Sequence, residues 1–132
     1  MPGQLVTASS QSQSSSHPQF SFQRLDVYVA ARDLAALVHR SPIQDSELRD
    51  QATRAAKSVF LALAEGLPHD APGQRRRYFS TAHASLCELV AALDLAAAIG
   101  VIAPARASSA LELAVRVKRM LFALRRPTAR AE

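Results

Sequence analysis

The most restrictive feature of this sequence is a run of apolar residues that recur at alternating spacings of three and four. These residues are Phe79, Ala82, Leu86, Leu89, Leu93 and Ala96. Such spacing places the side chains along one side of an α-helix and forms the seam of antiparallel bundles and coiled coils. It predicts a long helix over residues 71–99, ended by Gly100. This helix needs other helices to cover its seam.

Three other segments show helical periodicity. We expect these helices to run from about Phe22 or Arg24 to His39, from about Ser46 to Glu65, and from near Pro104 to about Leu124. Asp45 or Ser46 can cap the second of them, and Gly66 is expected to be its C-terminal glycine. No segment shows a convincing strand alternation. Four helices with short connections predict an all-α, antiparallel, up-down-up-down four-helix bundle.

Composition agrees with close-packed helices. Apolar residues make up 48% of the 132 residues, aromatic residues make up only 5%, and there is no Trp. Because alanine favours helix but buries little area, we expect a lone bundle to be modestly stable and to associate with other copies. Residues 1–19 are rich in Ser and Gln and lack charged side chains, which predicts a disordered tail. The predicted domains are therefore a tail at 1–19, a bundle at 20–126 and a short basic tail at 127–132.

The sequence also indicates a compartment. The single cysteine, Cys87, excludes an intramolecular disulfide and suits a reducing environment. The sequence contains no uninterrupted run of about eighteen apolar residues, so we expect no membrane-spanning helix. The first residues lack the basic and apolar segments of a signal peptide. We therefore expect a soluble cytoplasmic protein without a membrane partner.

The charge of the chain permits binding to acidic partners without requiring it. The formal net charge is +5, and only Lys57 and Lys118 among the basic residues are lysines. Arginine binds phosphate through a planar fork of donors. Two basic clusters, which an antiparallel bundle would bring to the same end, are Arg75, Arg76 and Arg77, and Arg116, Lys118, Arg119, Arg125 and Arg126. We hypothesise that they bind RNA or DNA. The alternative is an arginine-rich composition, typical of a GC-rich genome, that confers only solubility.

A second group of polar residues follows helical spacing. Gln51, Arg54, Ser58 and Glu65 share one face of the second predicted helix, and Ser85 and Glu88 lie one turn apart on the third. We hypothesise a hydrogen-bond network that fixes bundle register or subunit packing, with Arg54 paired to Glu65 or Glu88. The alternative is a solvated polar face.

Signals for catalysis are weak. His83 and Cys87 are four residues apart and could bind a metal, but no second pair has matching spacing. A packed small residue and a surface histidine are the favoured interpretation. The chain has no Glu-x-x-His pair and no glycine-rich phosphate loop. We therefore predict no catalytic residue, no metal, no cofactor and no enzymatic activity.

Separate blocks of the chain resemble the four helix bundle proteins, also called 23S rRNA-intervening sequence proteins. The first block is Phe22-Gln-Arg-Leu-Asp-Val-Tyr28, in which Tyr replaces the usual Trp. The others are Gln51-x-x-Arg54-Ala-Ala-x-Ser58, Ala64-Glu65-Gly66, Phe79-x-x-Ala82-x-x-Ser85-Leu-x-Glu88-Leu89 and the segment 95–100.

The resemblance implies a ring-shaped homo-oligomer, a pentamer, of antiparallel four-helix bundles without established enzymatic activity. Some members of this family are encoded within intervening sequences of bacterial large-subunit rRNA genes. A related branch is the accessory protein of diversity-generating retroelements, which binds reverse transcriptase and nucleic acid through a basic surface. The expected partners are thus other copies of the chain, nucleic acid, and a reverse transcriptase or other protein. The alternative is a purely structural or protein-interaction scaffold.

Overall fold

A computed structural model describes residues 25–125, and this part of the chain is helical. Its helices are α2 (Asp26–Arg40), α3 (Ser46–Gly66), α4 (Pro72–Ile99) and α5 (Pro104–Arg125). The predicted all-α class is confirmed, and the ends of α3, α4 and α5 lie within one residue of those expected. The predicted start of the first helix at Phe22 or Arg24 and the predicted tails at 1–19 and 127–132 lie outside the described residues.

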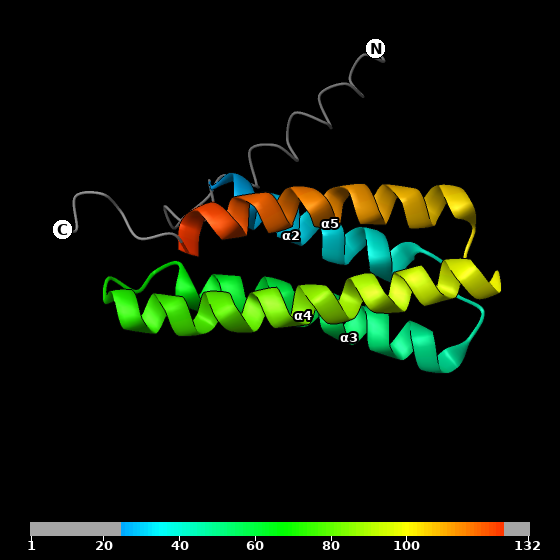
Figure 1. Ribbon diagram of the computed structural model, residues 1–132, viewed down its shortest axis with the longest axis horizontal. Helices are drawn as coiled ribbons and strands as arrows, with labels where there is room; N and C mark the ends of the chain where they lie inside the picture. Colours follow the sequence, from blue (N-terminus) through cyan, green and yellow to red (C-terminus); the bar gives the residue numbers. More distant parts are fainter. Residues whose placement is uncertain (1–24, 126–132) are drawn as a thin grey trace, which may run out of the picture.

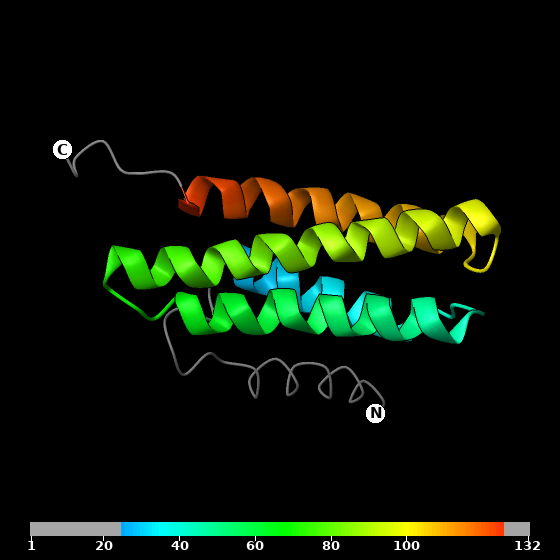
Figure 2. The same ribbon diagram turned by 60° about the horizontal axis from the view of Figure 1, so that its bottom comes forward.

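The four helices form two layers, with α2 and α5 in one and α3 and α4 in the other (Figure 1; Figure 2). The connection between α3 and α4 lies at one end of the molecule, together with the start of α2 and the end of α5. The other two connections lie at the opposite end. There the backbone N–H of Gln44 donates to the carbonyl oxygen of Val101 at 2.8 Å, and Ile43 pairs with Ile102 in an isolated β-bridge.

Local chemistry sets the helix ends. The Asp45 side chain accepts a hydrogen bond from the backbone N–H of Leu48 at 2.9 Å, as expected for an N-cap. Pro72 and Pro104 open their helices, where a missing N–H costs nothing. Gly100 ends α4 with a φ of 79°, a left-handed conformation that favours glycine.

Gly66 has a different role from the predicted one. Helix α3 continues through this residue, and the cap is Leu67 in a right-handed helical conformation. A Cβ atom added to Gly66 would lie 2.8 Å from the Cβ of Tyr78 and 2.8 Å from Cε1 of Phe79. Position 66 therefore requires glycine because α4 approaches the α3 backbone closely.

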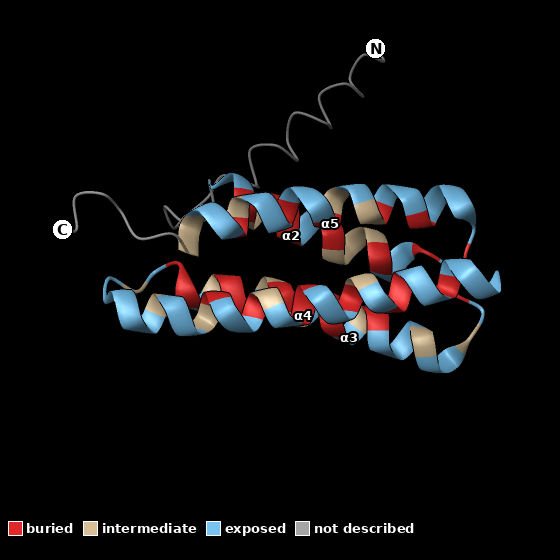
Figure 3. Ribbon diagram, in the orientation of Figure 1, coloured by how far each residue is buried: buried red, intermediate tan, exposed pale blue. Residues whose placement is uncertain are grey.

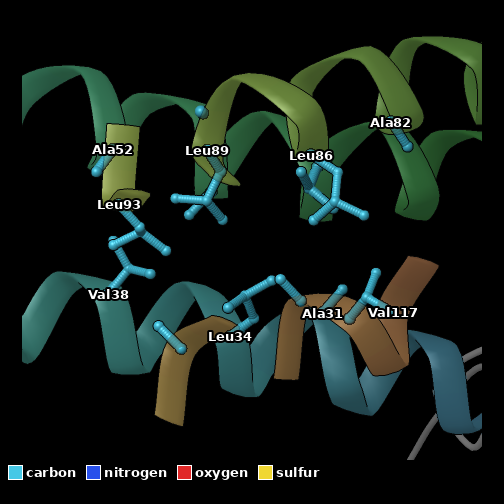
Figure 4. Packing of buried hydrophobic residues seen from close by; sticks show 14 of the residues in the cluster. Ala31, Leu34, Val38, Ala52, Ala82, Leu86, Leu89, Leu93 and Val117 are labelled. Atoms are coloured by element: carbon cyan, nitrogen blue, oxygen red, sulfur yellow. The ribbon is translucent and has the colours of Figure 1, made fainter. Parts of the chain in front are cut away.

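The core lies between the two layers (Figure 3). All six residues of the predicted heptad seam are at most 3% exposed, which confirms that prediction. Leu86, Leu89 and Leu93 point from α4 toward Leu34 and Val38 of α2 (Figure 4). Burial of these side chains is the main force that holds the layers together.

The most extensive helix contact is between α3 and α4. Small residues are buried along both of these helices: Ala52, Ala55, Ala56, Ala62 and Gly66 on α3, and Ala82, Ser85, Ala92 and Ala96 on α4. Since the distance between packed helices depends on the side chains at the contact, small residues permit this close pairing.

Helix α4 has one further property. By length and composition alone, it is the one described helix apolar enough to cross a membrane, although the sequence interrupts that window with Glu88 and Asp94. Part of the window, 39%, is buried inside the bundle. The core helix of a soluble protein meets the same criterion, so this is weak evidence for a membrane segment.

Candidate functional site

The three consecutive arginines at the start of α4 have different environments. Nη1 of Arg75 donates to the carbonyl oxygens of Leu67 at 3.3 Å and His69 at 3.2 Å. Its guanidinium also lies 5.3 Å from the centre of the Phe79 ring, within the range of a cation–π contact. The sequence grouped Arg75 with its neighbours, but the structure uses this side chain to hold the chain after α3.

Arg76 and Arg77 are the exposed members of this cluster. Together with Gly73, Ser80 and Thr81 they line a shallow surface depression. Within residues 25–125 the one ion pair joins Arg32 to Asp33, so neither Arg76 nor Arg77 has an acidic partner in that range. Two cations near a helix N-terminus also oppose the helix dipole. Their positive charge is therefore available to an external anion.

Tyr78 is the aromatic residue that the sequence places beside these arginines. Its ring stacks on that of His69, with centroids 5.4 Å apart and planes inclined by 8°. Tyr78 is half-buried. Tyr78 thus helps to fix the α3–α4 connection, and its ring already has a stacking partner.

The second basic cluster follows α5 toward the same end of the molecule (Figure 1). Arg116, Lys118 and Arg119 are exposed, and Arg125 is half-buried in the last turn. Arg126 lies outside the described residues. The structure therefore places the start of α4 and the end of α5 at one end, with cations from both helices. We call Arg76, Arg77, Arg116, Lys118, Arg119 and Arg125 the basic end.

Phe122 also belongs to this part of α5, and the sequence analysis missed it. Its side chain is 61% exposed, the largest value among the large apolar residues described. It follows the buried Leu121 by one position, which rotates it by about 100° away from the core. The detectable signal was its spacing: Phe122 lies outside the apolar stripe of α5 and within one turn of Lys118, Arg119 and Arg125.

The predicted polar network is only partly assembled within one chain. The hydroxyl oxygens of Ser58 and Ser85 are 2.7 Å apart and share a hydrogen bond between α3 and α4. The other four members, Gln51, Arg54, Glu65 and Glu88, are exposed. None of these four forms a side-chain hydrogen bond or ion pair with a described residue. Their hypothesised role in subunit contact stays a prediction.

His83 and Cys87 lie together on α4, with Cys87 Sγ 4.0 Å from Nε2 of His83. Cys87 is exposed. Among residues 25–125, no group of three or more His, Cys, Asp and Glu side chains could hold a metal ion. Two neighbouring side chains give too few ligands for a structural zinc site.

Fold and surface together define the class of protein: an all-α four-helix protein whose most distinctive exposed groups are cations at one end. The family model of the 23S rRNA-intervening sequence proteins matches residues 23–123, and the chain belongs to this family. No curated protein matches the chain.

Proposed function

We propose that this protein is a non-enzymatic four-helix-bundle protein that binds nucleic acid, RNA or DNA, through the basic end. The observation that carries the proposal is the gathering of exposed cations from α4 and α5 at one end of the molecule. Their charges are not neutralised by ion pairs within the described residues. Phosphate groups of a nucleic acid would supply the missing negative charge.

We propose also that the four helices follow an antiparallel, up-down-up-down path and that copies assemble into a ring-shaped homo-oligomer. The positions of the connections support the path. Exposed aliphatic side chains on α3 and α4, namely Leu61 (57%), Leu95 (50%) and Ile99 (54%), support burial against another copy. A ring would repeat the basic end around its axis and strengthen the positive field.

The test is binding of labelled RNA and DNA, measured by fluorescence anisotropy over a range of salt concentrations. Neutralising phosphate contacts makes log Kobs fall linearly with log salt, with a slope of about −0.9 per contact on duplex DNA. The double variant Arg76→Gln/Arg77→Gln should bind more weakly and show a shallower slope.

The matched control is Arg40→Gln/Arg106→Gln, which removes the same charge from the opposite end of the molecule, since these exposed residues lie at the end of α2 and the start of α5. The control should retain most of the affinity. Equal losses in the two double variants would show that only net charge matters, and this outcome would contradict a localised basic end.

The second candidate function is a protein-interaction scaffold without nucleic-acid binding. It is favoured by the same exposed aliphatic residues, which suit a protein contact better than a phosphate. Absence of binding at low salt, combined with an oligomeric mass in light scattering, would select this candidate.

A further inference from the structure

Phe122 is unusual among the aromatic residues between positions 25 and 125. The ring of Tyr28 packs on Phe60 at 4.9 Å, Tyr78 stacks on His69, and Phe79 is 1% exposed. Phe122 has no ring contact with another residue in that range and is 61% exposed. A single exposed apolar residue on a protein surface needs no explanation by itself. The exposure of Phe122 becomes informative through the residues that lie beside it.

Cations surround Phe122 on its own helix. Lys118 and Arg119 precede it by four and three residues, and Arg125 follows it by three. Residues at these spacings are neighbours on a helix surface, with Cβ atoms about 5–6 Å apart. Val115, which is 45% exposed, lies two turns before Phe122 on the same side. The end of α5 thus combines one free aromatic face with a rim of positive charge.

We propose that Phe122 is a stacking platform for an unpaired base, so that the basic end prefers single-stranded nucleic acid; this rests on the proposed function. Single-strand binding sites combine cations that track the phosphates with aromatic rings on which bases stack. A duplex keeps its bases stacked inside and offers Phe122 only its backbone. Lys118, Arg119 and Arg125 hold the phosphates, and Phe122 receives the base.

A second copy of the chain is the competing occupant of this surface. In a two-fold symmetric contact the same patch meets itself. Lys118, Arg119 and Arg125 would then face their own counterparts, and like charges opposed across an interface are costly. Charge complementarity therefore favours a nucleic acid over a two-fold copy at Phe122, while the uncharged aliphatic residues of α3 and α4 suit the contacts of a ring.

The experiment compares Phe122→Ala and Phe122→Leu on a labelled oligouridine and on an RNA duplex of the same length. Leucine keeps the apolar bulk and removes the aromatic face. We expect both variants to bind the single strand at least about five-fold more weakly, and to bind the duplex within about two-fold of the parent. The salt slope should stay unchanged in both, whereas Lys118→Gln and Arg119→Gln should reduce it.

A spectroscopic readout is direct because the chain contains no Trp. Phe122→Trp introduces one reporter at the site, and we expect oligouridine to quench its fluorescence more than the duplex does. Circular dichroism and light scattering of each variant show whether fold and mass are retained.

Three outcomes of these experiments would contradict one or both proposals. Binding of both RNA forms with no effect of Phe122→Ala and no preferential quenching would overturn the stacking inference and leave the proposed function intact. Absence of binding by the parent protein would overturn both. A lower solution mass in Phe122→Ala, restored in Phe122→Leu, would show that another copy covers this surface and would also overturn the inference.

Discussion

Ser58 on α3 and Ser85 on α4 share a hydrogen bond, with their oxygens 2.7 Å apart, between the two helices that have the most extensive contact in the bundle. Ser85 is 9% exposed, so water has little access to its hydroxyl. One hydroxyl donates to the other, and this hydrogen bond ties one level of α3 to one level of α4.

Removing one of these hydroxyls should destabilise the protein. Ser58→Ala and Ser85→Ala are each expected to lower the free energy of unfolding by about 1 kcal/mol, because a hydrogen bond is lost and its partner is left partly buried. The double variant should lose less than the sum of the two, since it leaves no unpaired hydroxyl. Urea denaturation of the four proteins in a double-mutant cycle measures this coupling. Strictly additive losses would show that the two hydroxyls act independently.

Replacing the glycine at position 66 should destabilise the protein. Gly66→Ala places a Cβ atom 2.8 Å from Tyr78 and Phe79, and we expect it to cost about 1–3 kcal/mol, as overpacking does. Gly73→Ala is the matched control, since no atom lies within 4 Å of its added Cβ. This control should be neutral or should stabilise α4 by up to about 1 kcal/mol. Thermal melting distinguishes them, and equal melting temperatures would contradict the close approach of α4.

Substitution of Arg75 should mainly lower stability, whereas substitution of Arg76 or Arg77 should mainly lower nucleic-acid affinity. Arg75→Ala removes two hydrogen bonds to carbonyl oxygens and is expected to cost about 1 kcal/mol of stability. Its effect on nucleic-acid affinity should be smaller than that of Arg76→Gln or Arg77→Gln. Those two exposed substitutions should leave the melting temperature unchanged. A strong loss of affinity in a stably folded Arg75→Ala protein would return Arg75 to the binding surface.

The cap of α3 gives a further prediction. Asp45→Ala removes the acceptor for the Leu48 N–H and should destabilise the protein by about 1 kcal/mol, whereas Asp45→Asn should retain most of the stability. Asp50→Ala, at an exposed position within the same helix, controls for the loss of a negative charge. Chemical denaturation is the measurement. Equal stability of Asp45→Ala and Asp50→Ala would argue against the cap.

The helices were predictable because their signals are local. Heptad spacing, the Asp45 cap and the positions of Pro104 and Gly100 each act within a few residues of the helix that they define. The role of Gly66 was not predictable in this way, because it depends on which residues of another helix lie opposite. Spacing along α3 contains no information on Tyr78 or Phe79.

The roles of the surface residues were also hard to predict, because they depend on where each side chain points in the folded protein. Arg75, Arg76 and Arg77 are chemically identical, yet successive residues of a helix point about 100° apart. One of them turns toward the carbonyl oxygens after α3, and the other two face solvent. Phe122 was missed because the apolar stripe was sought only where it faces the core. An apolar residue outside that stripe is informative about the surface only together with its neighbours, here Lys118, Arg119 and Arg125.

The hydrogen bond between Gln44 and Val101 has a mechanical consequence. The polypeptide joins the pair α2 and α3 to the pair α4 and α5 at the basic end, and this hydrogen bond joins the two pairs at the other end. Separating the two pairs of helices at that end requires this hydrogen bond to break. Under the proposed function, links at both ends limit how far the helices that carry the cations can move, and so limit the entropy lost when nucleic acid binds.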